Sequence, residues 1–330
     1  MESFLKDKLI LFTFFFNFSL FANECMETRA AIEIGMVNLK AKVAKVNICT
    51  QRVEVVLYED ILKFSLEEDL TPERQKIGIN QILEFKNKIH EFNPSITVAG
   101  TSSYISQIPK GISFIGAIQK ATQINPLIID PNSLAMLALI SVTQELGDTE
   151  ENFVVWDIGG AQMRMISKDK KDGYFTSLGE WGSIIFKNRI IDEIQKKKKK
   201  KNRSPNPIDP ETSGKALEIS RNWGGQVDPR ISNKIKLKNV KVIGIGGVHY
   251  SSVRQQANPS SSKFTSLEVE AAIKRNLNKP DNKLIGNFPE TQVTNLILVL
   301  GFMKELKIDM VETSQADLID GLLINPSLKF

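Results

Sequence analysis

An aspartate followed by two glycines ends an apolar run in the segment VVWDIGGAQMRMIS, residues 154–167. Asp157 lies where a buried strand is expected to reach the surface, and Gly159 with Gly160 lets the backbone approach a ligand closely. Backbone N–H groups in such a turn form a concavity that binds anions, and a neighbouring carboxylate suits a divalent metal ion or an attacking water molecule. The segment therefore indicates a phosphate site, although an ordinary hairpin turn would have the same letters.

Two other glycine tips follow apolar runs in the same manner. Gly35 follows AAIEI, in which Glu33 has the position that Asp157 has in the later segment, and Gly246 with Gly247 follows VKVIGI. We expect Glu33 and Asp157 to face each other across a cleft as catalytic carboxylates. Together they would hold one hydrated divalent ion, with Mg²⁺ as the expected cofactor.

The elements that carry these tips occur twice in the same order. The first set comprises strands at residues 30–36, 39–48 and 52–59, a helix that begins at Thr71, a strand at 95–102, a helix at 111–124, a strand at 126–130 and a helix from 131 or 132. The second set comprises a three-stranded meander at 152–181, a helix at 182–194, a strand within 240–253 and helices at 266–279, 293–306 and 316–324. This repetition predicts an α/β protein with two similar domains and a cleft between them.

The expected divisions follow from the repeat. A signal peptide would occupy residues 1–22, the N-terminal domain 23–146, and the C-terminal domain, with its closing helix, 147–330. Residues 196–230 are polar and contain several prolines, so we expect them to form an exposed connection.

The composition excludes some classes of protein. The chain has 330 residues, of which 42% are hydrophobic and 25% charged, as in ordinary globular proteins and unlike disordered or fibrous ones. The lysine block at residues 196–201 accounts for the whole formal charge of +5. We therefore expect no nucleic-acid duplex as a partner. The block itself could be a solvated loop, or could grip polyphosphate or an anionic membrane surface.

The N-terminal segment has the pattern of a secretory signal peptide. Lys6 and Lys8 precede an apolar run at residues 9–22, with Leu20 and Ala22 at the positions before the expected cleavage site. As a helix this run is shorter than a bilayer core of about 30 Å. We expect cleavage, export to the periplasm and no transmembrane helix afterwards, with an uncleaved anchor or a hydrophobic first element as the alternatives.

The two cysteines of the chain, Cys25 and Cys49, lie near the start of the expected mature protein. If residues 29–49 form a hairpin that turns near Val37, these cysteines face each other at its open end. Exported proteins occupy compartments where disulfides persist, so we expect a Cys25–Cys49 bridge. Two unrelated small apolar side chains are the alternative.

Five segments, in this order along the chain, resemble the Ppx/GppA family of exopolyphosphatases and guanosine pentaphosphate phosphatases: AAIEIGMVN, VVWDIGGAQMRMI, SLGEWGSIIFKNR, VIGIGGVHYSSV and VETSQADLIDGLLI. The resemblance implies two ribonuclease-H-like domains of the actin-like ATPase type with an interdomain cleft. It also implies phosphoanhydride hydrolysis, with polyphosphate or another phosphorylated anion as the partner, and leaves a homodimer open. The phosphate-binding residues that it implies are Gly35, Asn38, Lys40, Gly159, Gly160, Arg164, Gly246 and Gly247.

The chain departs from the family pattern where that pattern carries chemistry. The segment PLIIDPNSLAMLALISV aligns with the family segment that carries the water-activating glutamate, and it has Asn132, Ser133 and Leu134 in place of the acidic run. None of the three can act as a general base at neutral pH. Arg164 stands where the family has a glutamate, which inverts a charge beside the expected phosphate site.

Three functions remain open from the sequence. The chain could be a pseudoenzyme, or a strongly impaired phosphatase, that binds phosphate or polyphosphate. It could be an active phosphoanhydride hydrolase that uses Asp157 and a relocated base, with Asp130 and Glu145 as candidates. It could be an interaction protein of the cell envelope. His249 also has two interpretations, as a ligand contact beside the last glycine tip or, more simply, as a surface histidine.

Overall fold

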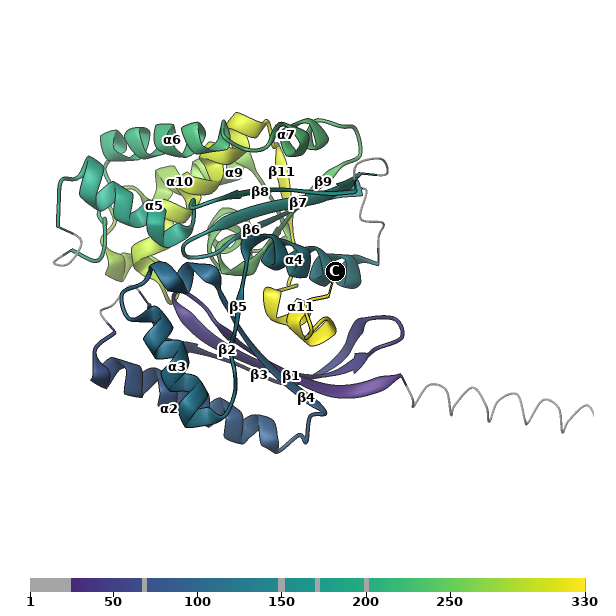
Figure 1. Ribbon diagram of the computed structural model, residues 1–330. Helices are drawn as coiled ribbons and strands as arrows, with labels where there is room; N and C mark the ends of the chain where they lie inside the picture. The colour runs from purple at the N-terminus through teal and green to yellow at the C-terminus, as the bar shows by residue number, and fades with distance from the viewer. Residues whose placement is uncertain (1–24, 67–69, 148–151, 170–172, 199–201, 330) are drawn as a thin grey trace, which may run out of the picture.

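The computed structural model describes residues 25–66, 70–147, 152–169, 173–198 and 202–329. The expected signal peptide lies outside these ranges. Two β-sheets, each flanked by helices, form the two halves of the structure (Figure 1). Within the described ranges, no helix combines the length and the apolar character that crossing a bilayer requires.

The first sheet contains five strands in the order β3-β2-β1-β4-β5. An antiparallel meander comes first, and two parallel strands then extend the sheet. The strands are β1 (Met26–Ile34), β2 (Asn38–Asn47), β3 (Arg52–Lys63), β4 (Ile96–Ser102) and β5 (Leu127–Ile129). Helices α2 (Pro72–His90) and α3 (Gly111–Thr122) cover one face of this sheet and bury Phe85 and Phe114 against it.

The second sheet repeats the first and adds one edge strand. Its order is β10-β11-β9-β6-β7-β8, so that β8-β7-β6-β9-β11 corresponds to β3-β2-β1-β4-β5. The strands are β6 (Phe153–Ile158), β7 (Met163–Asp169), β8 (Gly173–Gly179), β9 (Lys241–Ile245), β10 (Lys263–Thr265) and β11 (Met310–Thr313). The surrounding helices are α5 (Ser183–Arg189), α6 (Pro210–Gly224), α7 (Pro229–Ile235), α8 (Arg254–Ala257), α9 (Ser266–Asn276) and α10 (Pro289–Leu306). The repeat read from the sequence is therefore present as two sheets of one topology.

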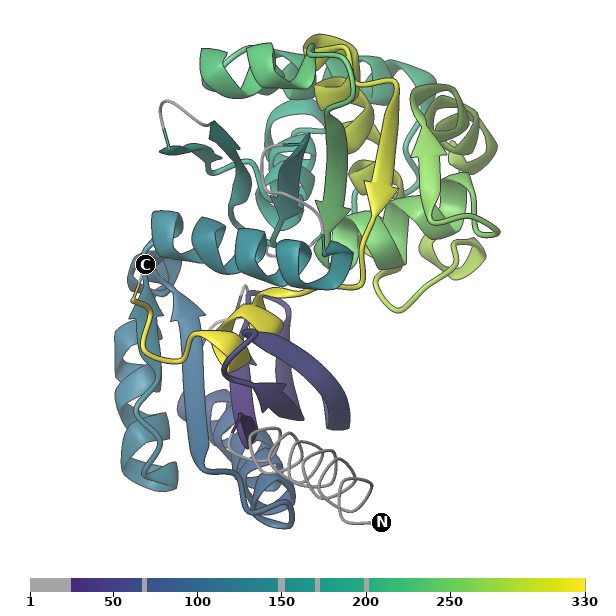
Figure 2. The same cartoon turned by 90° about the vertical axis from the view of Figure 1, so that its right-hand side faces the viewer.

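The two halves exchange a helix. Helix α4 (Pro131–Leu146) follows β5 in the chain but packs against β6, β7 and β8 of the second sheet, whereas α11 (Leu318–Ile324) packs against β1 to β4 of the first. Figure 2 shows both helices between the sheets. They touch at Gly321, where an added Cβ would lie 2.6 Å from the carbonyl oxygen of Leu137, so only glycine permits this approach.

The expectation that residues 196–230 form an exposed connection is wrong. This stretch contains α6, which buries Ala216 and Trp223, and it ends at the start of α7. The physical reason is visible in the sequence. Asp209 accepts from the N–H of Thr212 as the N-cap, and Pro210 occupies the first helical position, the same start as Thr71 and Pro72 give to α2.

A disulfide joins Cys25 to Cys49 across the open end of the β1–β2 hairpin, as expected, with their Cα atoms 5.5 Å apart. The ladder pairs Met26 with Asn47, and the N–H of Ile48 donates to the carbonyl oxygen of Cys25. Cys49 is therefore one residue beyond the position directly opposite Cys25. The hairpin turns between Met36 and Val37, half a residue earlier than the position assumed from the sequence.

Candidate functional site

The first and second glycine tips are two turns of the same geometry. The N–H of Gly35 donates to the carbonyl oxygen of Asn38 at 2.9 Å between β1 and β2, and the N–H of Gly159 donates to that of Gln162 at 2.9 Å between β6 and β7. The repeat therefore extends from the strands to the hydrogen bonds of the loops that join them.

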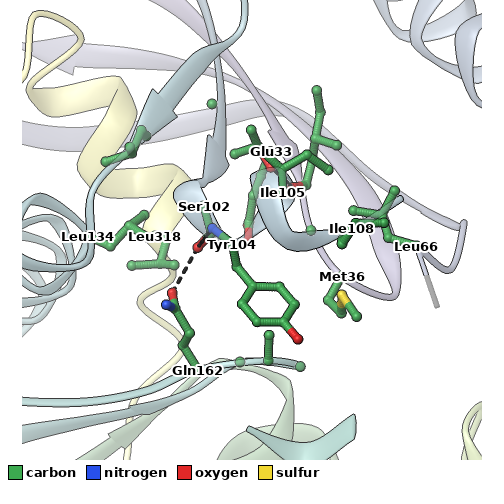
Figure 3. A pocket seen from close by; sticks show the side chains of 18 of the residues that line it. Glu33, Met36, Leu66, Ser102, Tyr104, Ile105, Ile108, Leu134, Gln162 and Leu318 are labelled. Carbon is green, nitrogen blue, oxygen red and sulfur yellow. Dashed lines mark hydrogen bonds between the residues drawn. The ribbon is translucent and has the colours of Figure 1, made fainter. Parts of the chain in front are cut away.

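These two loops lie against each other. A Cβ added to Gly160 would lie 2.6 Å from the Cβ of Met36, so the first loop fills the space beside the second. The hydroxyl of Ser102, at the end of β4, donates to Oε1 of Gln162 at 2.8 Å (Figure 3). The two loops are therefore in direct contact through Met36 and Gly160, and β4 contacts the second loop through Ser102.

A cavity of about 90 Å³ lies at this junction, and both halves of the chain line it. Most of its lining is apolar, and Figure 3 shows these side chains. The apolar side chains are Ile34, Met36, Leu66, Ile105, Ile108, Ile129, Leu134, Leu318 and Leu322, and the polar ones are Glu33, Thr101, Ser102, Tyr104, Gln162 and Arg164. The cavity therefore differs from the basic groove that a long polyanion would require.

Glu33 is paired with a base on the neighbouring strand. Lys40 lies directly opposite in the β1–β2 ladder, and its Nζ is 3.3 Å from Oε2 of Glu33. The same ammonium contacts the carboxylate of Asp317. Burial raises the pKa of Glu33 although Lys40 opposes the shift, and the charges of Asp317 and Asp157 add to the rise. Burial would by itself lower the pKa of Lys40, but Asp317 and Glu33 raise it above its ordinary value.

Asp157 is paired in the corresponding way. Arg164 lies directly opposite in the β6–β7 ladder, and its Nη1 is 2.5 Å from Oδ2 of Asp157. Only 5% of each side chain is exposed. Burial raises the pKa of Asp157 although Arg164 opposes the shift. Gly246 has a φ of 78°, and a Cβ there would lie 3.2 Å from Oδ1 of Asp157. The third glycine tip is therefore packed closely against this carboxylate.

The start of α11 brings two further acids to the site, and the sequence analysis did not include them. Asp317 and Asp320 form a capping box at the start of α11. The side chain of Asp317 accepts from the backbone N–H of Asp320, and the side chain of Asp320 accepts from the backbone N–H of Asp317. Burial would raise the pKa of Asp317, but Lys40 and the N–H of Leu318 lower it below its ordinary value. The Nζ atom of Lys42, two residues beyond Lys40 on β2, is 2.8 Å from Oδ1 of Asp320. The motif Asp-x-x-Asp before an apolar run was the available signal.

We call Glu33, Lys40, Asp157, Arg164 and Asp317 the charge cluster. Its three carboxylates and two cations come from β1, β2, β6, β7 and the N-cap of α11. Both bases expected to bind phosphate are therefore engaged by carboxylates of the chain itself.

The third tip and His249 differ from the first two tips. Gly247 has open space where a Cβ would be, and it precedes the π-helical turn Val248–Val253. His249 is fully buried, so the expectation of a surface histidine is wrong. Its ring packs on Trp156 with centroids 4.6 Å apart, and burial lowers its pKa to about 3. Within the described part of the chain, neither ring nitrogen has a hydrogen-bond partner.

Neither candidate for a relocated base, Asp130 or Glu145, lines the cavity, whereas Leu134, from the segment that aligns with the acidic run, does. Asp130 caps α4 and accepts from the N–H groups of Asn132 and Ser133, and hydrogen bonds from the hydroxyl and N–H of Ser133 lower its pKa. Glu145 accepts from the hydroxyl of Ser314 and the N–H of Ala316.

The carboxylates as folded do not fit Mg²⁺. Among the described residues, no group of three or more histidine, cysteine, aspartate or glutamate side chains is placed to hold a metal ion. Glu33 and Asp157, which were expected to hold the ion, are each in contact with a cation of the chain. A divalent ion at this position would be repelled by Lys40 and Arg164.

Solved structures of the Ppx/GppA family are among those similar to this chain. The Aquifex aeolicus family member matches with a TM-score of 0.69 at 14% identity, over 92% of this chain and 98% of that one. An exopolyphosphatase from Cytophaga hutchinsonii matches with a TM-score of 0.70 at 15% identity, over 91% of this chain and 97% of that one. No family model matches the chain, and no curated protein does. The resemblance read from the sequence is thus confirmed at the level of the fold.

Proposed function

We propose that this chain is a pseudoenzyme with the Ppx/GppA fold, a protein that keeps the two-domain scaffold and its cleft without hydrolysing phosphoanhydrides. The observation that carries the proposal is the pairing of both loop-tip carboxylates, Glu33 with Lys40 and Asp157 with Arg164. A carboxylate that is engaged by a side-chain cation of the chain is not free to hold a divalent ion. A cation that compensates a buried carboxylate is likewise a poor ligand for phosphate.

The alternative of an active hydrolase with a relocated base has less support. Asp130 and Glu145 serve as a helix cap and as an acceptor for the loop before α11, and neither lines the cavity. Leu134 occupies the cavity wall in the segment that aligns with the acidic run of the family. Loss of a positioned general base alone lowers rates by about 10²–10⁴-fold.

Polyphosphate, or another phosphorylated anion, is the ligand that the resemblance implies. Engagement of Lys40 and Arg164 by carboxylates, together with the apolar cavity lining, leads us to propose that this site binds such an anion weakly. A homodimer stays a prediction from the sequence.

The experiment measures release of inorganic phosphate from long-chain polyphosphate by the purified protein with Mg²⁺, with the Cytophaga hutchinsonii exopolyphosphatase assayed alongside. We expect a rate at least about 10²-fold below that enzyme. A comparable rate that disappears in Asp157→Asn would overturn the proposal and favour the hydrolase. Equilibrium dialysis against polyphosphate separates the remaining cases, because an envelope interaction protein would bind none.

We also propose that the protein is exported to the periplasm. The apolar leader supports this location, and so does the Cys25–Cys49 disulfide, since such bonds persist outside the reducing cytoplasm. Fractionation of cells that express the full chain, with mass measurement of the secreted form, tests it. A protein found whole in the cytoplasm with both thiols reduced would contradict it.

A further inference from the structure

We propose that Lys40 and Arg164 are built-in substitutes for a divalent metal ion, so that the loop-tip carboxylates of both halves are compensated without any metal. The inference concerns metal binding. It does not depend on whether the protein hydrolyses anything.

The pairing of an acid with a base occurs twice. Glu33 lies two residues before Gly35 and directly opposite Lys40, and Asp157 lies two residues before Gly159 and directly opposite Arg164. The strands involved are equivalent in the two sheets. A single acid–base pair could have arisen by chance. The same pair at both equivalent positions indicates that both pairs have the same role, which is to compensate a buried carboxylate at each loop tip.

Both acids are largely buried. The side chain of Asp157 is only 5% exposed and that of Glu33 is 18% exposed. A buried carboxylate needs a compensating charge, because removing it from water without one is strongly unfavourable. A bound metal ion or a side-chain cation can supply that charge. Here Lys40 and Arg164, themselves largely buried, already do so.

Each cation connects separate segments, as a bridging metal ion would. Lys40 contacts Glu33 on β1 and Asp317 at the start of α11, which follows the whole second sheet in the chain. Nη2 of Arg164 is 3.4 Å from Oε1 of Gln162, which in turn accepts from Ser102 of the first half. Lys40 therefore joins the start of α11 to the first sheet, and Arg164 contacts Gln162, the residue that joins the second half to the first.

The experiment uses the purified full-length protein and measures bound Mn²⁺ by electron paramagnetic resonance and the midpoint of thermal unfolding in MgCl₂ against NaCl of equal ionic strength. For the wild type we expect no bound Mn²⁺ and no difference between the two salts. The variant Lys40→Met/Arg164→Met removes both cations and keeps side chains of similar length. We expect it to bind Mn²⁺ and to unfold about 2 °C or more higher in millimolar MgCl₂.

The matched control is Lys42→Met, which removes a cation from the same strand that pairs with Asp320 and Glu59 outside the cluster. It should lower the unfolding midpoint without any response to Mg²⁺. If the double variant does not fold, Arg164→Met alone replaces it. Bound Mn²⁺ in the wild type that is lost in Asp157→Asn overturns the proposal, and so does a folded variant that ignores both ions. If neither variant folds, the amount of Mn²⁺ bound by the wild type decides between the two outcomes.

Discussion

The Nη1 atom of Arg164 lies 2.5 Å from Oδ2 of Asp157, and the two residues face each other directly in the β6–β7 ladder. The sequence alone predicts separate roles for these residues, as a metal-binding acid and a phosphate-binding base. Their pairing gives each residue a partner of opposite charge within the chain.

The first prediction concerns this pair. Arg164→Met leaves the Asp157 carboxylate buried without its cation, and removing one member of a buried pair typically costs about 3–5 kcal/mol. Urea unfolding of the variant against the wild type measures the loss. Arg164→Met/Asp157→Asn should recover part of it, because no unpaired charge is then buried. A loss below about 1 kcal/mol in the single variant would show that Asp157 is not held by Arg164.

The second prediction concerns the contact between the loops. Gly160→Ala places a Cβ against Met36, and overpacking of this kind typically costs about 1–3 kcal/mol. Adding Met36→Ala to this variant should restore most of the stability, because the shorter side chain leaves room for the new Cβ. Gly247→Ala, at a tip with open space for a Cβ, is the matched control and should be nearly neutral. Equal losses at both glycines would contradict the contact.

The third prediction concerns the disulfide, whose cysteines are 24 positions apart. Closing a loop of this size is expected to stabilise the fold by about 3 kcal/mol through its effect on the unfolded chain. Denaturant unfolding of Cys25→Ser/Cys49→Ser should show this loss. Reductant should destabilise the wild type by a similar amount and leave the variant unchanged. A variant as stable as the oxidised protein would contradict the prediction.

The fourth prediction concerns acid. Burial lowers the pKa of His249 from 6.5 to about 3, so the unfolded chain binds a proton at pH values where the folded one does not. Stability from this residue is complete above about pH 6.5 and falls as the pH drops toward about 3, by up to about 1.4 kcal/mol per pH unit. Buried acids with raised pKa values, such as Glu33 and Asp157, act in the opposite sense, so the comparison must be between variants.

Urea unfolding of His249→Phe at pH 7 and pH 5 isolates the effect, and it should show a smaller loss on acidification than the wild type. His90→Gln, which changes an exposed histidine at the end of α2, should keep the wild-type dependence. Equal pH dependence in the wild type and in His249→Phe would contradict the assignment.

Local signals predicted much of the fold. Thr71 with Pro72 marked the start of α2 to the residue, and apolar runs that end in glycine marked the tips of β1, β6 and β9. The repeated order of strands then predicted the two sheets. The same logic could have found α6, because Asp209 and Pro210 mark its start, but the lysines and prolines before it favoured a loop.

The charges at the site were less predictable, because their partners are distant in the sequence. Lys40 and Asp317 are 277 positions apart, and no periodicity relates them. The cross-strand pairs were within reach, since a tight turn at Gly35 or Gly159 fixes which residues face each other. His249 was misjudged because a single histidine after two glycines carries no information on burial.

The exchange of α4 and α11 has a consequence for the timing of biosynthesis. The first sheet leaves the ribosome early, but the helix that covers its second face begins only at Leu318, after the whole second sheet has been made. Domains that fold as they emerge complete the N-terminal one first. The apolar face formed by Ala31, Ala44 and Val98 packs against Ile319 and Leu322 as well as against residues of α4. We therefore expect the packing of the first half to be completed only after the C-terminal segment has been synthesised.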